Sequence, residues 1–196
     1  MDDNRNKKKE TVYEAVINLV RTGKSYHNMK VSDIAVEAGI GKGTIYEYFD
    51  SRDTLIAETV MYFLDRYLKQ AVDLINSEKS FEKRMCALFE FIHNESAENL
   101  NIMDVLFIKG GISDIYSALK GADTFEDFVR VIDGYCRFIL MDAEEEGVIK
   151  QVEDMDYATY VLKSSVVSFI FSTNAVKRSF ETVCGNTMQA LLKALN

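Results

Sequence analysis

The chain of 196 residues contains no proline, only ten glycines and two histidines, and three cysteines. Few segments alternate polar and apolar residues, whereas many repeat apolar residues at helical spacing, so the sequence predicts an all-α fold. Cys86, Cys136 and Cys184 are odd in number, far apart and free of CxxC spacing. This pattern excludes a disulfide framework and is typical of reduced thiols in a cytosolic protein.

Long hydrophobic runs are also missing. The strongest, SSVVSFIFS at residues 164–172, is too short to span a bilayer. The first ten residues, MDDNRNKKKE, lack the apolar core of a signal peptide. We therefore expect a cytoplasmic protein that has no membrane partner.

The net charge of −8 argues against a generally basic nucleic-acid binder, but the charge is unevenly spread. Residues 1–50 hold eight Lys and Arg against eight Asp and Glu, and the remaining residues hold fifteen against twenty-three. A local positive face that includes Lys7, Lys8 and Lys9 is therefore compatible with an acidic body. The asymmetry permits a nucleic-acid partner without identifying one.

Apolar periodicity predicts a series of helices with a functional boundary near residue 50. We expect Gly23 to end the first helix, Gly39 to end the second in a left-handed C-cap, and Ser51 to cap the fourth. The predicted helices span residues 8–21, 31–38, 42–48, 52–76, 81–98, 100–109, 112–120, 124–146, 154–176 and 187–195.

The glycine-rich stretch AGIGKGTIYEYF, residues 38–49, admits two readings. A P-loop requires Ser or Thr after its lysine and a preceding strand, but Lys42 is followed by Gly43 and the upstream segment is helical. A dinucleotide fingerprint that begins at Gly39 requires glycine where the chain has Thr44. Both phosphate-cradle readings are therefore excluded.

A helix-turn-helix fits the same stretch. Gly39 supplies the tight turn between two short helices, and Gly41 and Gly43 let the second helix approach a DNA backbone closely. Lys42, Thr44 and Tyr46 then project toward the groove. The apolar residues Ile34, Ala38, Ile45 and Phe49 form the predicted interior with the first helix. The alternative is an ordinary helical hairpin in a core, which has no need of an exposed GKGT surface.

The segment VSDIAVEAGIGKGTIYEYFDSRDTL resembles the DNA-binding signature of the TetR family of bacterial transcriptional regulators, over roughly residues 8–60. The resemblance implies a three-helix DNA-binding domain at residues 1–50 and a helical effector-binding and dimerisation domain at 51–196. It also implies a homodimeric repressor that binds a palindromic operator in double-stranded DNA. The DNA-contacting positions that it implies are Lys30, Ser32, Gly41, Lys42, Gly43, Thr44, Tyr46, Tyr48 and Arg52. Gly41 departs from the family, whose members often have serine there.

The body is rich in aromatic residues and methionine, and most of these are expected in the core. A small, mostly apolar effector is predicted to contact a subset, Tyr62, Phe89, His93, Met103, Phe107, Tyr116, Phe128 and Tyr160. His93 is the one histidine after residue 50 and has no His or Cys at ligand spacing, so no metal site is predicted. Because HExxH and GxSxG motifs are absent, we expect neither an enzyme nor a cofactor.

Two further features of the body bear on assembly. Ser164, Ser168 and Ser172 recur every four residues, a spacing that favours close approach of two helices in a dimer, although a polar pocket wall is an alternative. The apolar residues predicted at the dimer surface are Val161, Phe169, Met188, Leu191, Leu192 and Leu195. The acidic cluster at residues 142–146 is expected to be a solvated helix end. A helical ligand-binding or scaffold protein without DNA binding remains the alternative function, and an activator remains possible.

Overall fold

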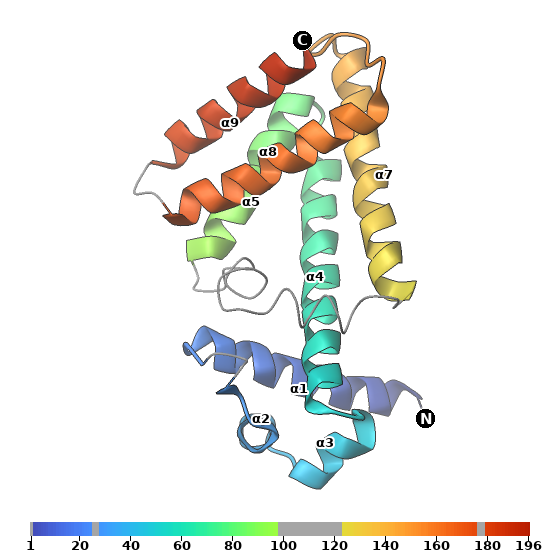
Figure 1. Cartoon of the computed structure of the whole chain (residues 1–196), viewed down its shortest axis with the longest axis vertical. Coiled ribbons are helices and arrows are strands. Elements are labelled where there is room, and N and C mark those ends of the chain that lie inside the picture. Colours follow the sequence, from blue (N-terminus) through green and yellow to red (C-terminus); the bar gives the residue numbers. More distant parts are fainter. Residues whose placement is uncertain (1, 25–27, 98–122, 176–178) are drawn as a thin grey trace. The chain divides into compact units, whose positions relative to one another are not determined.

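The computed structural model describes residues 2–24, 28–97, 123–175 and 179–196. Within these ranges the regular secondary structure is helical throughout, which confirms the predicted all-α class (Figure 1). The helices are α1 (Asp2–Arg21), α2 (Val31–Ala38), α3 (Lys42–Tyr48), α4 (Arg52–Ser77), α5 (Phe81–Ala97), α7 (Asp123–Glu145), α8 (Met155–Ala175) and α9 (Phe180–Leu195). The helices predicted at 100–109 and 112–120 lie outside the described residues. No helix in the described ranges has the length and apolar character needed to cross a membrane.

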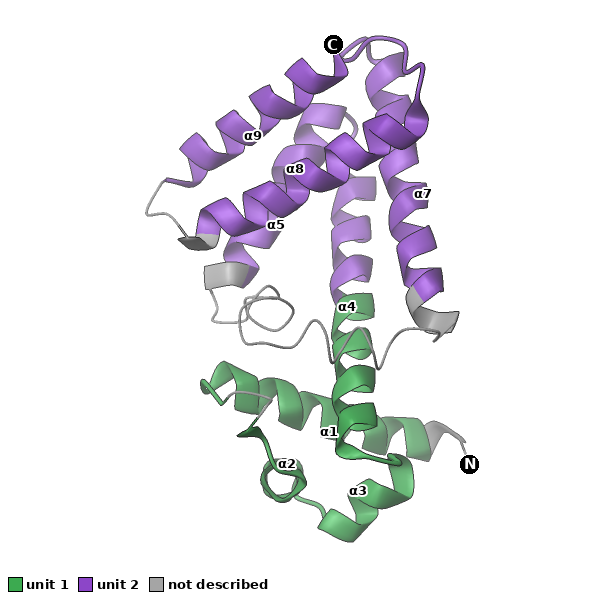
Figure 2. Ribbon diagram, in the orientation of Figure 1, with its two compact units in different colours: residues 1–66, 102–125 green, residues 67–101, 126–196 purple. Residues whose placement is uncertain are grey.

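The chain divides into two compact units, and the division falls within α4 (Figure 2). Unit 1 contains α1, α2, α3 and α4 as far as Arg66. Unit 2 contains the rest of α4 from Tyr67, together with α5, α8, α9 and α7 from Glu126 onward. The functional boundary near residue 50 remains a prediction, because compactness does not report which residues bind DNA.

In unit 1, α1 buries one stripe of side chains and contacts both α2 and α3. Val12, Ala15 and Val16 lie on this stripe and are buried. The helix ends at Arg21, and Gly23 just beyond it has a φ of 87°, the left-handed conformation expected where a helix stops. It begins at Asp2, six residues before the predicted start, because Arg and Lys are good helix formers even without an apolar period.

In unit 2, aromatic and aliphatic side chains from several helices form one core. Phe81, Met85 and Phe89 of α5 are fully buried, as is Phe169 of α8, whose ring stacks on Phe89 with 4.4 Å between centroids. Leu191 of α9 and Leu140 of α7 join the same cluster. The predicted place of Phe169 and Leu191 at a dimer surface is wrong, because each side chain points into the core.

Helix α9 starts seven residues before its predicted first residue. Ser179 caps it, since the Ser179 hydroxyl accepts a hydrogen bond from the Thr182 backbone N–H at 3.4 Å. Gly185, two residues before the predicted start, lies inside α9 with open space around it. A single glycine weakens a helix without ending it when neighbouring residues pack well.

The acidic cluster at the end of α7 is not simply solvated. Asp142 pairs with the buried Arg84 of α5. Both carboxylate oxygens of Glu146 accept a hydrogen bond from the Phe81 N–H, each at 3.0 Å, at the start of α5. Two of these carboxylates therefore connect the end of α7 to the beginning of α5, and the expected solvated end is corrected.

Candidate functional site

The turn between α2 and α3 has the geometry that a helix-turn-helix requires. Gly39 follows α2 with φ 66° and ψ 26°, a left-handed conformation that strains any residue with a Cβ. The Ile40 N–H donates to the Ala35 carbonyl at 3.0 Å, and the Gly39 N–H donates to that of Val36 at 3.2 Å. These bonds close α2 and turn the chain sharply into α3, which confirms the predicted C-cap.

Apolar side chains fix the two short helices against the rest of unit 1. Ile34, Ile45 and Phe49 are each at most 2% exposed, and Ala38 is half-buried. The Phe49 ring packs edge-on against Tyr13 of α1, with 5.7 Å between centroids. The predicted interior is thus confirmed, with Ala38 at its edge, and α3 is held rigidly by its buried side.

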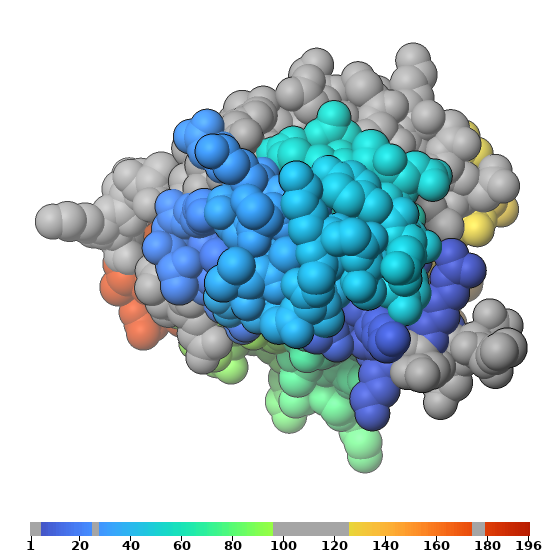
Figure 3. Space-filling model, turned by 90° about the horizontal axis from the view of Figure 1, so that it is seen from below, coloured from blue at the N-terminus to red at the C-terminus, as the bar shows by residue number. Residues whose placement is uncertain are grey.

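The opposite side of α3 is exposed and polar. Gly41, Lys42, Gly43 and Tyr46 are exposed, whereas Thr44 is half-buried. The Lys42 ammonium lies 6.0 Å from the centre of the Tyr46 ring. A Cβ placed on Gly43 would meet no atom within 4 Å, so the first turn of α3 presents bare backbone to its surroundings. Figure 3 shows the face of unit 1 on which α2 and α3 lie.

The start of α2 carries two of the predicted phosphate contacts, Lys30 and Ser32, and both are exposed. Asp33 lies beside them, and its carboxylate accepts from the Lys30 N–H at 3.1 Å and from the Lys24 ammonium at 2.7 Å. The hydrogen bond from Lys24, followed by that from Lys30, holds the pKa of the Asp33 carboxyl below its ordinary value. Lys24 therefore neutralises a carboxylate next to a predicted phosphate contact, a role that only the folded arrangement reveals.

The Arg52 side chain makes contacts within the protein in addition to its predicted DNA contact. Its Nε donates to the Met29 carbonyl at 2.8 Å, and its Nη1 pairs with Asp53 at 2.7 Å. The side chain thus ties the start of α4 to the segment that precedes α2, while about a third of it stays exposed. Tyr48, at the end of α3, is half-buried, and the guanidinium of Arg5 lies 5.9 Å from its ring centre.

Two carboxylates join α1 to α4. Glu58 accepts from the Lys9 ammonium and from the Tyr13 hydroxyl, each at 2.7 Å. Glu14 accepts from Nη1 of Arg66 at 2.5 Å and from the Tyr62 hydroxyl at 3.3 Å. We call this set of residues, Lys9, Tyr13, Glu14, Glu58, Tyr62 and Arg66, the α1–α4 clasp. It fixes the first turns of α4 to α1.

Burial and the two carboxylates raise the pKa of both clasp tyrosines. Burial is the larger cause for Tyr13, followed by its hydrogen bond to Glu58. Burial also leads for Tyr62, followed by the charge of Glu14. Both phenols therefore stay protonated and donate at any physiological pH. Tyr62 belongs to unit 1, whereas Phe89, His93, Phe128 and Tyr160 belong to unit 2.

The remaining predicted effector contacts are scattered. Phe89 is fully buried, and His93, one turn further along α5, is half-buried with its ring 5.1 Å from that of Phe180. Nδ1 of His93 is buried and lacks a hydrogen-bond partner among the described residues. Phe128 is half-buried on α7, whereas Tyr160 on α8 is 66% exposed. Met103, Phe107 and Tyr116 lie outside the described residues.

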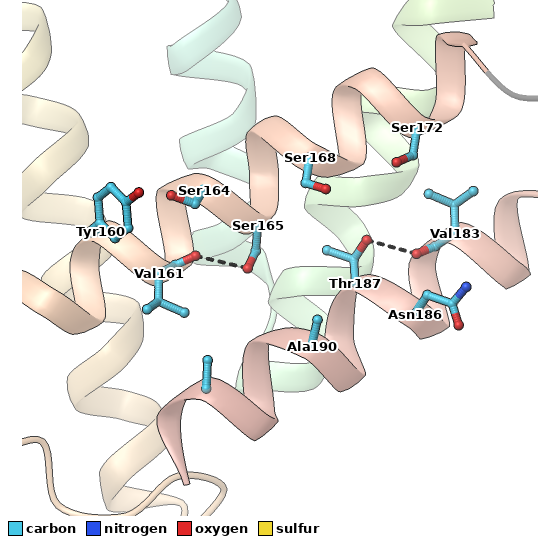
Figure 4. Close-up of a pocket in the computed structure, with 11 residues that line it drawn as sticks. Tyr160, Val161, Ser164, Ser165, Ser168, Ser172, Val183, Asn186, Thr187 and Ala190 are labelled. Atoms are coloured by element: carbon cyan, nitrogen blue, oxygen red, sulfur yellow. Dashed lines mark hydrogen bonds between the residues drawn. The ribbon is translucent and has the colours of Figure 1, made fainter.

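Tyr160 borders a groove of about 390 Å³ between α8 and α9 (Figure 4). The α8 wall carries the serine series Ser164, Ser168 and Ser172, and α9 contributes small residues such as Thr187 and Ala190. The Thr187 hydroxyl donates to the Val183 carbonyl of its own helix at 2.9 Å. Large apolar residues also lie exposed on α8, namely Tyr157, Val167 and Phe171. The groove is thus lined mainly by small side chains of α8 and α9, and α8 also carries exposed apolar side chains.

Comparison with known proteins agrees with this architecture. The family model "Bacterial regulatory proteins, tetR family" matches residues 22–59. A fatty acid metabolism regulator protein of Bacillus subtilis (strain 168) is 21% identical over 166 residues, which cover 85% of this chain and 82% of the relative.

Two solved structures illustrate the shared fold. The transcriptional regulator FadR from Bacillus subtilis, in complex with stearoyl-CoA, superposes with a TM-score of 0.71 at 16% identity and covers 95% of this chain and 99% of its own. The ketosteroid transcriptional regulator KstR2 of Mycobacterium tuberculosis gives a TM-score of 0.62 at 19% identity, with coverage of 96% and 94%.

A rigid α2–turn–α3 pair with an exposed recognition helix, joined to a larger helical unit, defines a helix-turn-helix, DNA-binding transcriptional regulator. Residues 22–59, which span α2, α3 and the start of α4, match the TetR family of bacterial regulatory proteins. The chain's relatives are regulators and not enzymes.

Proposed function

We propose that this protein is a cytoplasmic homodimeric repressor that binds a palindromic operator through α3 and leaves it when a lipophilic effector occupies the body. The observation that carries the proposal is the first turn of α3, where exposed Lys42 and Tyr46 surround the bare backbone of Gly43 on a rigidly packed helix. A helical hairpin in an ordinary core can carry any polar residue on its exposed side. Such a hairpin would not require bare backbone between an exposed lysine and an exposed tyrosine.

The predicted DNA contacts divide by chemistry. Lys42, with Lys30 and Ser32 at the start of α2, is suited to phosphate oxygens and so to binding any sequence. Thr44 and Tyr46, further along α3, are suited to base edges in the major groove. The free N–H groups at the start of α3 add a favourable site for phosphate, which Gly41 and Gly43 leave unobstructed.

We infer that the effector is a long-chain acyl thioester or a molecule of similar shape. The aromatic interior of unit 2 around Phe89, Phe169 and Phe180 supports an apolar ligand. The FadR relative that carries stearoyl-CoA supports the acyl class. The buried Nδ1 of His93, which has no hydrogen-bond partner among the described residues, supports a polar group of the ligand near the end of α5.

Dimerisation through the α8–α9 groove completes the proposal. The small side chains of Ser164 and Ser168 permit close approach of a second copy, and the exposed Tyr157, Val167 and Phe171 supply apolar area. Two-fold symmetry would set two α3 helices about one turn of DNA, ~34 Å, apart.

The helix that carries the signal is α4 in this proposal. Its first turns belong to the α1–α4 clasp, and its later turns belong to unit 2, where Tyr67 packs on Phe91 with 4.6 Å between ring centres. A ligand that shifts the later turns would therefore shift α1 and the helices packed on it. DNA and effector would then favour different conformers of the same dimer.

Selection of binding sites from random duplex DNA tests the proposal. We expect wild-type protein to enrich a palindrome with half-sites about ten base pairs apart. Thr44→Ala and Tyr46→Ala should change the preferred bases, whereas Lys42→Ala should weaken binding to every sequence. A wild-type selection that yields no enriched site, with no retention on DNA at low salt, would support the scaffold alternative instead.

A further inference from the structure

We propose that the beginning of α1 forms an additional DNA contact, in which the Arg5 guanidinium binds a backbone phosphate next to the bases read by α3. This inference rests on the proposed DNA binding and adds to it a residue outside the α2–α3 signature. The juxtaposition of Arg5 with Tyr48 at the end of α3 is its starting point, with 5.9 Å from the guanidinium carbon to the ring centre.

The basic cluster at the start of the chain divides into two groups with different roles. Lys9 is committed to the interior of unit 1, since its ammonium pairs with Glu58 at 2.7 Å and lies 5.0 Å from the centre of the Phe49 ring. Arg5, Lys7 and Lys8 are exposed. The charge available to a partner therefore lies in the first two turns of α1, and Arg5 is the member that contacts α3.

Helical structure and the contact with Tyr48 both restrict where the Arg5 side chain lies. Because α1 begins at Asp2, the backbone of Arg5 is already ordered. A guanidinium that lies near an aromatic face is attracted by the ring and keeps the N–H groups at its edge available. Less side-chain entropy is then lost when a phosphate binds than for a freely moving lysine.

The beginning of α1 also lies beside the surface on which α3 is exposed. In the view of Figure 3, the first described residues of α1 border the surface formed by α2 and α3. A duplex that contacts α3 on this surface would bring its sugar–phosphate backbone toward the beginning of α1. The chemistry points to phosphate and not to a base edge, because a guanidinium forms paired, charge-assisted hydrogen bonds with phosphate oxygens.

The test compares Arg5→Ala with wild type on a selected operator over a range of salt concentrations. We expect Arg5→Ala to bind about 10-fold more weakly and to lower the salt slope by about one per contacted phosphate, with base preference unchanged. Lys7→Ala is the matched control, since Lys7 lies about 200° around α1 from Arg5, at about 100° per residue. It should change affinity less than about two-fold.

A scan of single neutral methylphosphonate substitutions along the operator separates direct contact from a structural effect. At one phosphate in each half-site, the methylphosphonate substitution should weaken DNA binding by wild type. The same substitution should not weaken DNA binding by Arg5→Ala any further. If both proteins respond alike at every phosphate, or if Arg5→Ala binds as wild type does, the inference is wrong while DNA binding stands. If wild type binds no DNA, the proposed function itself fails.

Discussion

Gly43 lies in the first turn of the recognition helix, where a Cβ would meet nothing within 4 Å in the free protein. Glycine inside a helix costs roughly 0.5–1 kcal/mol relative to alanine. Gly43→Ala should therefore raise the free energy of unfolding by about that amount and still weaken DNA binding, because the added methyl group would separate the α3 backbone from the duplex. Urea unfolding and titration with operator DNA measure the two effects.

The matched control for this variant is Gly134→Ala in α7, because Gly134 is also helical and exposed, and a Cβ added there would meet no atom within 4 Å. It should stabilise the protein to a similar extent and leave DNA affinity unchanged. Equal DNA affinity for Gly43→Ala and wild type would show that the start of α3 does not approach the duplex closely.

Asp33 predicts a pH dependence of stability. Its pKa is lowered in the folded protein, so its contribution is present at neutral pH and is lost as the pH falls below the ordinary value of 3.8. Asp33→Asn should thus be less stable than wild type near pH 7, and the difference should shrink under acid conditions. Unfolding curves at several pH values check this, and a constant difference would contradict the assignment.

At the scale of single residues, local chemistry could be predicted and distant partners could not. Gly39, Ser51 and the apolar interior of unit 1 follow from turn, capping and periodicity rules that involve near neighbours. Lys24 meets Asp33, and Arg52 meets Met29, only after the chain folds back on itself. The two pairs are separated by 9 and 23 positions, which no local spacing rule connects, so these partners required the structure.

Of the contacts between helices, those of the α1–α4 clasp can be tested most directly by substitution. Glu58→Gln removes the charge that Lys9 pairs with and weakens the acceptor of the Tyr13 hydroxyl. We expect the free energy of unfolding to fall by about 1 kcal/mol, the usual contribution of such a hydrogen bond. If α4 transmits the signal, the effect of effector on DNA affinity should also shrink.

Asp73→Asn provides the control, since it makes the same chemical change at an exposed position of α4 outside the clasp. Denaturation curves and DNA titrations with and without effector should both match wild type for this variant. A Glu58→Gln protein that is less stable yet fully responsive would make the clasp purely structural.

The helix ends show why sequence patterns place some elements better than others. The predicted bounds of α5 and α7 are within one residue of the observed ends because their apolar periods are strong. The sequence places the starts of α1 and α9 too late, since one begins with charged residues and the other contains Gly185. The inward orientation of Phe169 and Leu191 depends on which faces of α8 and α9 meet, which periodicity alone does not specify.

For the whole molecule, the α8–α9 groove predicts how two copies assemble. Ser168→Arg would place a long charged side chain where close approach of a second copy is proposed. Sedimentation equilibrium should show a monomer for this variant and a dimer for wild type, and operator affinity should fall by at least about 100-fold as the second recognition helix is lost. Gln151→Arg adds the same charge at an exposed position outside the groove and should remain dimeric. A dimeric Ser168→Arg protein would place the interface elsewhere.

The most direct measurement of the central claim is the affinity of the dimer for the proposed acyl thioester, titrated by calorimetry in the presence and in the absence of saturating operator DNA. Linkage requires that an effector which lowers DNA affinity bind more weakly to the DNA-bound dimer, by the same factor. We expect that factor to be roughly 5- to 150-fold, the usual range of coupling between two sites. Equal affinity in both titrations would contradict a ligand-controlled repressor.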